Sequence, residues 1–166
     1  MKKLTSALLI GALALGAYWL YGKLFPNDEQ VIRALLAEVA ENASVPAGEG
    51  NFAKVAAVNA LAACFSPDVE IRLDGTPGEI SSIQGRRELQ QVVQAARSHV
   101  GSAQIAFADV LLEFGAEPGN ATAQTVATAR IDKPEELWVQ ELKMTLARMD
   151  GAWKITRVEP VRALDR

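Results

Sequence analysis

The chain has 166 residues, with 17 basic and 20 acidic side chains, one cysteine and one histidine. A single cysteine excludes an intramolecular disulfide and a multi-cysteine metal site, and a single histidine excludes a pair of histidine ligands. From residue 24 onward, 14 basic residues accompany 20 acidic ones, which argues against nucleic acid as a partner because such proteins present basic surfaces. We expect no metal and no cofactor.

The first predicted element is a membrane anchor. The eighteen residues Leu4–Tyr21 contain no charge and no proline, and they follow Lys2 and Lys3. As a helix they would extend about 27 Å, the lower limit for crossing a bilayer. Aromatic and basic side chains at the far end are typical of interfacial anchors: Tyr18, Trp19, Tyr21 and Lys23.

A cleaved secretory signal is the alternative, because small residues around Ala14 and Gly16 would suit a cleavage site. The apolar run continues past them through Leu20, which favours a retained anchor. We therefore expect an anchor over residues 1–23, a linker over 24–27 and one domain over 28–166. The chain would cross the cytoplasmic membrane once, with its domain outside or in the periplasm; after cleavage it would be secreted.

Two helices and a strand are predicted next. Asn27 and Gln30 have capping-box spacing, and Val31 to Val39 carry an apolar stripe at helical period. A loop over residues 44–50 leads to a second helix, capped by Asn51 and ended by Ser66-Pro67-Asp68. Alternation at period two then predicts a half-buried strand over residues 69–74.

The remaining sequence predicts a third helix and a run of strands. A turn over residues 74–78 and a short strand over 79–83 precede a helix over 86–100, which Gly101 ends. Four long strands follow, at residues 102–114, 121–132, 137–149 and 152–163. Asp150-Gly151 between the last two is a strong signal for a two-residue hairpin turn.

This order of elements resembles the nuclear-transport-factor-2-like superfamily, which includes ketosteroid isomerase and SnoaL-like proteins. Three motifs strengthen the resemblance: Ala63-Cys-Phe-Ser-Pro-Asp-Val-Glu-Ile71, Ile83-Gln-Gly-Arg86 and Gly151-Ala-Trp-Lys-Ile155. The resemblance implies an α+β domain of three helices on a curved, mainly antiparallel sheet, shaped as a cone with a pocket at its open end. Enzymes and non-enzymes share that fold, so function depends on individual residues.

The residues that the isomerases use for chemistry are not matched. The resemblance calls for a helix-borne tyrosine and an aspartate, but Tyr18 and Tyr21 both belong to the anchor. His99 ends the third helix, where a favourable interaction with the helix dipole explains it without catalysis. Cys64 lies in a small, apolar helical context and is expected to be a buried hydrophobic residue.

Asp109 is the one weak catalytic candidate. By period two it shares a strand face with Ile105, Phe107 and Leu111. If it pairs near Thr125 among apolar groups, desolvation would raise its pKa and make it an acid or base. The opposite strand face is nearly as apolar, and we favour an exposed Asp109.

The Asp150-Gly151 turn sets the register of the last hairpin. It pairs Arg148 with Trp153, Leu146 with Ile155 and Met144 with Arg157, so that Trp153 and Ile155 join the buried face. Arg157 would point inward and bind an anionic ligand unless a bulge turns Val158 inward instead; we favour the bulge. The predicted ligand-binding residues are Phe107, Asp109, Trp138, Trp153 and Arg157.

The function favoured by the sequence is a membrane-anchored, extracytoplasmic binding or assembly module. Its architecture resembles the periplasmic assembly domain of type IV secretion systems. The sheet, with Arg72, Glu141, Lys143 and Lys154 outward, would bind a second copy or an envelope protein. Two alternatives stay open: a SnoaL-like enzyme of isomerase, dehydratase or hydrolase type that acts on a small apolar substrate, and a non-catalytic lipid or metabolite carrier.

Overall fold

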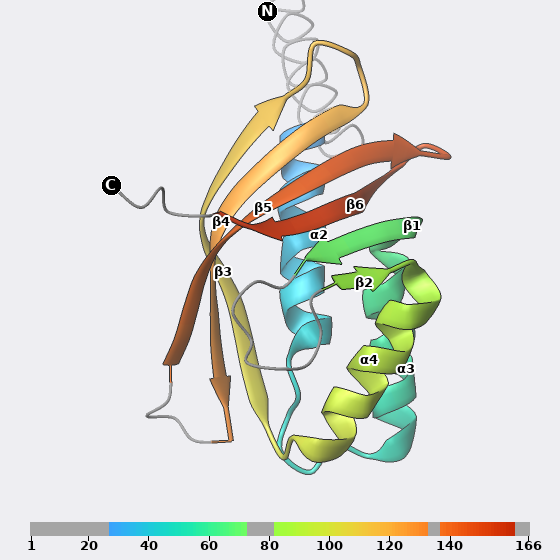
Figure 1. Ribbon diagram of the computed structural model, residues 1–166, viewed down its shortest axis with the longest axis vertical. Coiled ribbons are helices and arrows are strands. Elements are labelled where there is room, and N and C mark those ends of the chain that lie inside the picture. Colours follow the sequence, from blue (N-terminus) through green and yellow to red (C-terminus); the bar gives the residue numbers. More distant parts are fainter. Residues whose placement is uncertain (1–26, 73–81, 133–136, 162–166) are drawn as a thin grey trace, which may run out of the picture. The chain divides into compact units, whose positions relative to one another are not determined.

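The computed structural model describes residues 27–72, 82–132 and 137–161 (Figure 1). The contacts within the chain define two compact units, with the boundary between Val31 and Ile32. The predicted anchor, Leu4–Tyr21, lies outside the described residues. Within the described part, no helix has the length and apolarity needed to cross a membrane.

The first described helix, α2, spans Asp28–Ala43. In its N-terminal unit the side-chain oxygen of Asn27 accepts a hydrogen bond of 2.8 Å from the backbone N–H of Gln30, as the capping spacing predicted. In the larger unit, α2 buries one side of its apolar stripe through Ile32, Leu36 and Val39.

The second helix, α3 (Asn51–Ala63), begins and ends differently from the prediction. Asn51 is already helical, and the extended residue before it is Gly50, so Asn51 is not the cap. Strand β1 (Phe65–Arg72) starts directly after Cys64, earlier than the period-two pattern indicated. Pro67 lies where the register of β1 against its neighbour shifts, a position that tolerates a missing N–H donor.

A short strand and the third helix follow. Strand β2 (Ser82–Gln84) precedes α4 (Arg86–His99). Gly85 between them has φ 81°, a backbone conformation that glycine adopts without a steric penalty. Its N–H donates to the carbonyl of Val69 at 2.7 Å, which fixes the start of α4 against β1. Helices α3 and α4 lie against each other, and α4 also contacts β1 and β2 (Figure 1).

The long strands are β3 (Ala103–Phe114), β4 (Asn120–Ile131), β5 (Leu137–Met149) and β6 (Ala152–Pro160). They complete a six-stranded sheet in the order β2-β1-β6-β5-β4-β3. The sheet is mixed, because β1 and β6 run parallel while the other neighbouring strands are antiparallel. The described residues thus confirm the α+β class with three helices on a sheet.

Side chains alternate between two faces of the sheet. The inner face carries the buried residues of β4 at every second position from Ala121 to Ala129. It also carries Leu146, Trp153 and Ile155, all of them buried as predicted. The outer face carries the intervening residues, which are more exposed.

Candidate functional site

Part of the inner face is exposed to solvent where β4 ends and β5 begins. Ile105 and Phe107 of β3 pair with Ala129 and Ala127 of β4, and Ala129 pairs with Trp138 of β5. These five residues, here called the inner band, form two neighbouring rows on the inner face: Ile105–Ala129–Trp138 across three strands and Phe107–Ala127 across two. The two alanines are buried, but Trp138 is 48 % exposed. An aromatic ring left open beside small residues can contact an apolar group.

Trp153 is not part of the inner band. It is buried beside Phe114, with ring centroids 6.5 Å apart in an edge-on arrangement. The guanidinium carbon of Arg148 lies 5.7 Å from the Trp153 ring centroid, the cation–π contact that the Asp150-Gly151 register predicted. Trp153 therefore belongs to the core near the β5–β6 hairpin.

Asp109 lies in a β-bulge and is exposed. The pairing of β3 with β4 shifts between Ala108 and Leu111, and Asp109 has φ 52°. The extra residue ends the simple alternation, so Asp109 does not share the face of Phe107. The structure thus places it on the solvent side, as the favoured reading of the sequence had it, and separates it from the inner band.

Arg157 is exposed for a similar reason. The register of β5 with β6 shifts between Thr145 and Leu146, so that Val158, not Arg157, pairs with Met144 and is buried. The predicted bulge is confirmed. A nitrogen of Arg157 lies 2.8 Å from one carboxylate oxygen of Glu70, and the other oxygen accepts a hydrogen bond of 2.9 Å from Arg72. These contacts from Arg72 and Arg157 lower the pKa of Glu70.

The contacts that His99 and Cys64 make are structural. His99 is exposed at the end of α4, with its Nδ1 2.8 Å from the carbonyl of Ala95. Cys64 is buried, as predicted, and burial raises the pKa of its thiol to about 11. A protonated thiol is a poor nucleophile at neutral pH. The described residues contain no cluster of acidic, histidine or cysteine side chains suited to a metal.

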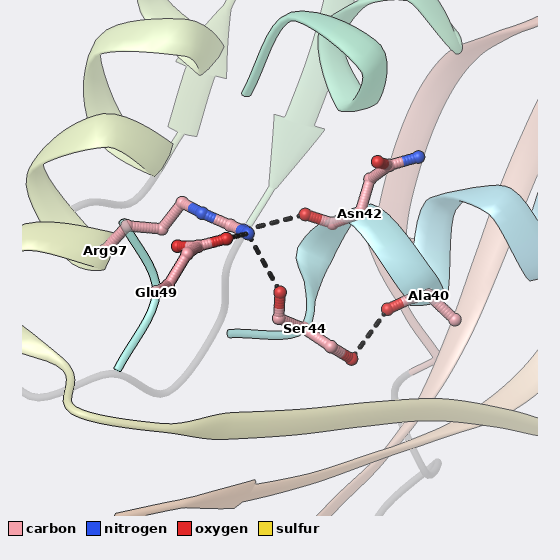
Figure 2. A network of polar contacts seen from close by, with 5 residues as sticks. All are labelled: Ala40, Asn42, Ser44, Glu49 and Arg97. Atoms are coloured by element: carbon pink, nitrogen blue, oxygen red, sulfur yellow. Dashed lines mark hydrogen bonds and ion pairs between the residues drawn. The ribbon is translucent and has the colours of Figure 1, made fainter. Parts of the chain in front are cut away.

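The most polar buried cluster joins α4 to the segment after α2 (Figure 2). Arg97 donates to the carbonyls of Asn42 at 2.8 Å and Ser44 at 2.9 Å, and to the Glu49 carboxylate at 2.8 Å. The side chains of Arg97 and Glu49 are only 3 % and 4 % exposed. The Ser44 hydroxyl donates to the Ala40 carbonyl at 2.8 Å. The cluster fixes the loop between α2 and α3.

Sequence analysis missed this cluster, although a signal for it exists. Arg97 falls four residues after Val93 and eight after Leu89, on the stripe that α4 turns inward. A charged residue at such a position requires a buried partner. Glu49, in the loop between α2 and α3, is that partner. The pairing is hidden in the sequence because Glu49 and Arg97 lie far apart in it.

A groove of about 530 Å³ lies beside that loop. Its apolar lining comes from Val45, Pro46 and Ala103, and its charged lining from Glu41, Arg130 and Asp132. The Asp132 carboxylate already accepts hydrogen bonds of 2.8 Å from the N–H groups of Gly101 and Ser102. The groove is separate from the inner band, and Asp132 within it holds the start of β3.

Residues 55–159 match the family model of the SnoaL-like domain, which covers more than half of the chain. The chain belongs to the SnoaL-like family. No curated protein matches the chain. The match includes α4 and all six strands as far as Glu159, so it contains the inner band, Asp109, Arg157 and Arg97. Glu49 and the groove residues that precede α3 lie before it.

Solved structures give the same fold. A nuclear-transport-factor-2-like protein with a cystatin-like fold from Novosphingobium aromaticivorans is 18% identical, with a TM-score of 0.61 over 89% of this chain and 86% of that chain. A domain of unknown function from Nostoc punctiforme is 19% identical, with a TM-score of 0.62 over 85% and 80%. A protein of unknown function from Mycobacterium tuberculosis is 20% identical, with a TM-score of 0.61 over 82% and 78%. These similarities establish the nuclear-transport-factor-2-like cone fold for the SnoaL-like domain.

Proposed function

We propose that this SnoaL-like domain is a binding or assembly module, anchored by Leu4–Tyr21 outside the cytoplasmic membrane, whose outer sheet face contacts a protein partner. One observation carries the proposal: the outer face exposes large apolar side chains between charged ones. We call this surface the outer patch: Leu111, Val139, Glu141, Lys143 and Val161.

Strand register brings the outer patch together. Leu111 pairs with Gln124, and Gln124 pairs with Lys143, so β3, β4 and β5 share a row. The N–H of Val161 donates to the carbonyl of Glu141 at 2.9 Å, which adds the residue after β6. Val139 lies two residues before Glu141, on the same face.

This composition fits a protein interface. Exposed apolar side chains that alternate with charged ones are found on surfaces that bind another protein. Glu141 and Lys143 offer both signs of charge on one strand, which suits a second copy as well as a different envelope protein. Arg72 and Lys154 extend the outer face, but Arg72 pairs with Glu70 and Lys154 donates to the carbonyl of Ala63.

Photo-cross-linking tests the partner surface. A benzophenone amino acid at position 139 of the full chain, in native membranes, should give a product cross-linked to the partner. In the chain without that amino acid, Val139→Lys should remove the partner from co-purification. Ile131→Lys is the matched control, because Ile131 is 47 % and Val139 54 % exposed but Ile131 lies on the inner side. Recovery of a monomer without any cross-linked product would contradict the proposal, as would a turnover that Asp109→Asn abolishes.

The anchored location is tested separately. Mass spectrometry of the mature N-terminus should recover Tyr18 to Lys23, and protease added to spheroplasts should digest the domain. A mature chain that begins after Gly16 would instead indicate secretion after cleavage. The basic residues Lys2 and Lys3 support the proposed orientation, since positive charge stays on the cytoplasmic side.

The inner band favours a second candidate function, the binding of a small apolar ligand. Trp138 is its most exposed member, and Phe107 lies two strands away on the same face. Apolar ligands that bind there should change Trp138 fluorescence, and Trp138→Ala should abolish the change. Trp153→Phe serves as the control, because Trp153 is buried elsewhere.

A further inference from the structure

We infer that the groove of about 530 Å³ beside the α2–α3 loop binds a basic α-amino acid, for which L-lysine is the probe. We call this site the corner groove. Its charged residues are Glu41, Arg130 and Asp132, and its apolar ones are Val45, Pro46 and Ala103. The corner groove shares no residue with the outer patch or the inner band, so the inference goes beyond the proposed function.

Strand pairing brings the charged residues of the corner groove to one corner of the sheet. Gln104 at the start of β3 pairs with Arg130 near the end of β4. The N–H of Asp132 donates to the carbonyl of Ser102 at 2.9 Å. Glu41 comes from the last turn of α2, next to the loop that joins the border of β3 (Figure 1). Three separate segments of the chain thus supply the three charges.

The charges of the corner groove are available to a ligand. Glu41 and Arg130 are exposed, and within the described residues neither side chain forms an ion pair or a hydrogen bond. The two hydrogen bonds that the Asp132 carboxylate accepts both end on Oδ1, and its Oδ2 accepts none from the described part of the chain. Opposite charges that line one groove without contacting each other can each bind a complementary group.

The balance of two acids and one base indicates the class of ligand. A basic α-amino acid has one carboxylate, which the planar guanidinium of Arg130 can bind through two hydrogen bonds. It also has two positive groups, one for each of Glu41 and Asp132. The methylene groups between its charged ends would contact Val45 and Pro46. The volume of the corner groove falls within the range of small-molecule sites, about 300–1,000 Å³.

Equilibrium dialysis of the full chain against labelled L-lysine, in mild detergent at low ionic strength, tests the inference. Three unlabelled competitors each lack one charged group of lysine: 1,5-diaminopentane the carboxylate, 6-aminohexanoate the α-amino group and L-leucine the side-chain amino group. We expect each to bind about fivefold more weakly than lysine, the upper range for loss of one exposed ion pair. Absence of lysine binding would overturn the inference, as would equal binding of lysine and the three competitors.

Two variants assign the binding to the corner groove. Arg130→Gln should weaken the binding of lysine about fivefold without weakening that of 1,5-diaminopentane, because only lysine offers a carboxylate. Glu41→Gln should weaken the binding of both compounds. Arg87→Gln and Glu113→Gln are the controls, since they remove the same charges from exposed positions outside the groove. Equal losses in the control variants would show that lysine binds elsewhere and would contradict the inference.

Discussion

The hydroxyl of Thr125 donates a 2.7 Å hydrogen bond to the carbonyl of Ala108, across the bulge that turns Asp109 outward. Thr125 is buried on the inner face. A bulge breaks the regular ladder, so the freed carbonyl needs another donor. A threonine among the alanines of β4 supplies that donor.

Replacing Thr125 by valine should destabilise the domain by about 1–3 kcal/mol, because the shape is kept while the Ala108 carbonyl loses its partner. Urea unfolding of the full chain in mild detergent measures the change. Thr122→Val, on the outer face of the same strand, is the control. Equal stability of the two variants would show that the bulge does not depend on Thr125.

Asp109→Gly should leave the stability unchanged or raise it by up to about 1 kcal/mol, since glycine adopts positive φ without strain. Asp109→Val should lower it by about 1–2 kcal/mol, because β-branched side chains are strained there. Glu113→Gly, in the same strand, should be destabilising. A stabilising valine at position 109 would be inconsistent with the bulge geometry.

The buried pair of Arg97 and Glu49 should be sensitive to loss of one partner. Arg97→Met leaves the Glu49 carboxylate buried without its ion pair and should cost about 3–5 kcal/mol. The double variant with Glu49→Leu should recover part of that loss. Thermal unfolding of both, with exposed Arg87→Met as control, measures the coupling; strictly additive losses would argue against it.

Glu70 should contribute to the acid sensitivity of the domain. Hydrogen bonds from Arg72 and the charge of Arg157 lower the pKa of Glu70 in the folded state. Its stabilising effect is therefore complete above the unfolded value of 4.5 and is lost as the pH falls through the folded value. Glu70→Gln should make the free energy of unfolding fall less steeply as the pH is lowered than it does in Glu141→Gln. An unchanged curve would show that these contacts are not maintained.

The Cys64 thiol should resist alkylation until the domain unfolds. With a pKa of about 11, about one thiol in a thousand is ionised at pH 8. Because folding raises this pKa from 9.0, the associated stability is complete below pH 9 and declines as the pH rises through 11. Iodoacetamide labelling followed by mass spectrometry measures the protection of the thiol. The dependence of this labelling on urea and on pH measures the change in stability. Rapid labelling of the native chain would contradict the buried thiol.

The sequence predicted the order of elements well, because helical and strand periods are local properties. The Asp150-Gly151 turn fixed the pairs Arg148–Trp153 and Leu146–Ile155, since a two-residue turn allows one register. The same turn made a bulge at Arg157 foreseeable, because the alternative would bury its charge.

Other features depend on tertiary contacts that periodicity does not describe. The bulge at Asp109 interrupts alternation where the sequence reads as a continuous strand, so the faces of Phe107 and Leu111 differ. Strand β1 begins four residues before the alternating pattern because it pairs with β6 across a shifted register. The partnership of Arg97 with Glu49 joins segments far apart in the sequence.

The loop after α2 covers part of the free edge of β3. Val45 exchanges two backbone hydrogen bonds with Ala103, and the Ser44 hydroxyl accepts from the N–H of Ile105. With the bulge at Asp109 further along, only short runs of this border remain flat enough to accept another strand. Identical chains at high concentration would thus be prevented from joining their sheets into a continuous ribbon, and association between them would remain reversible.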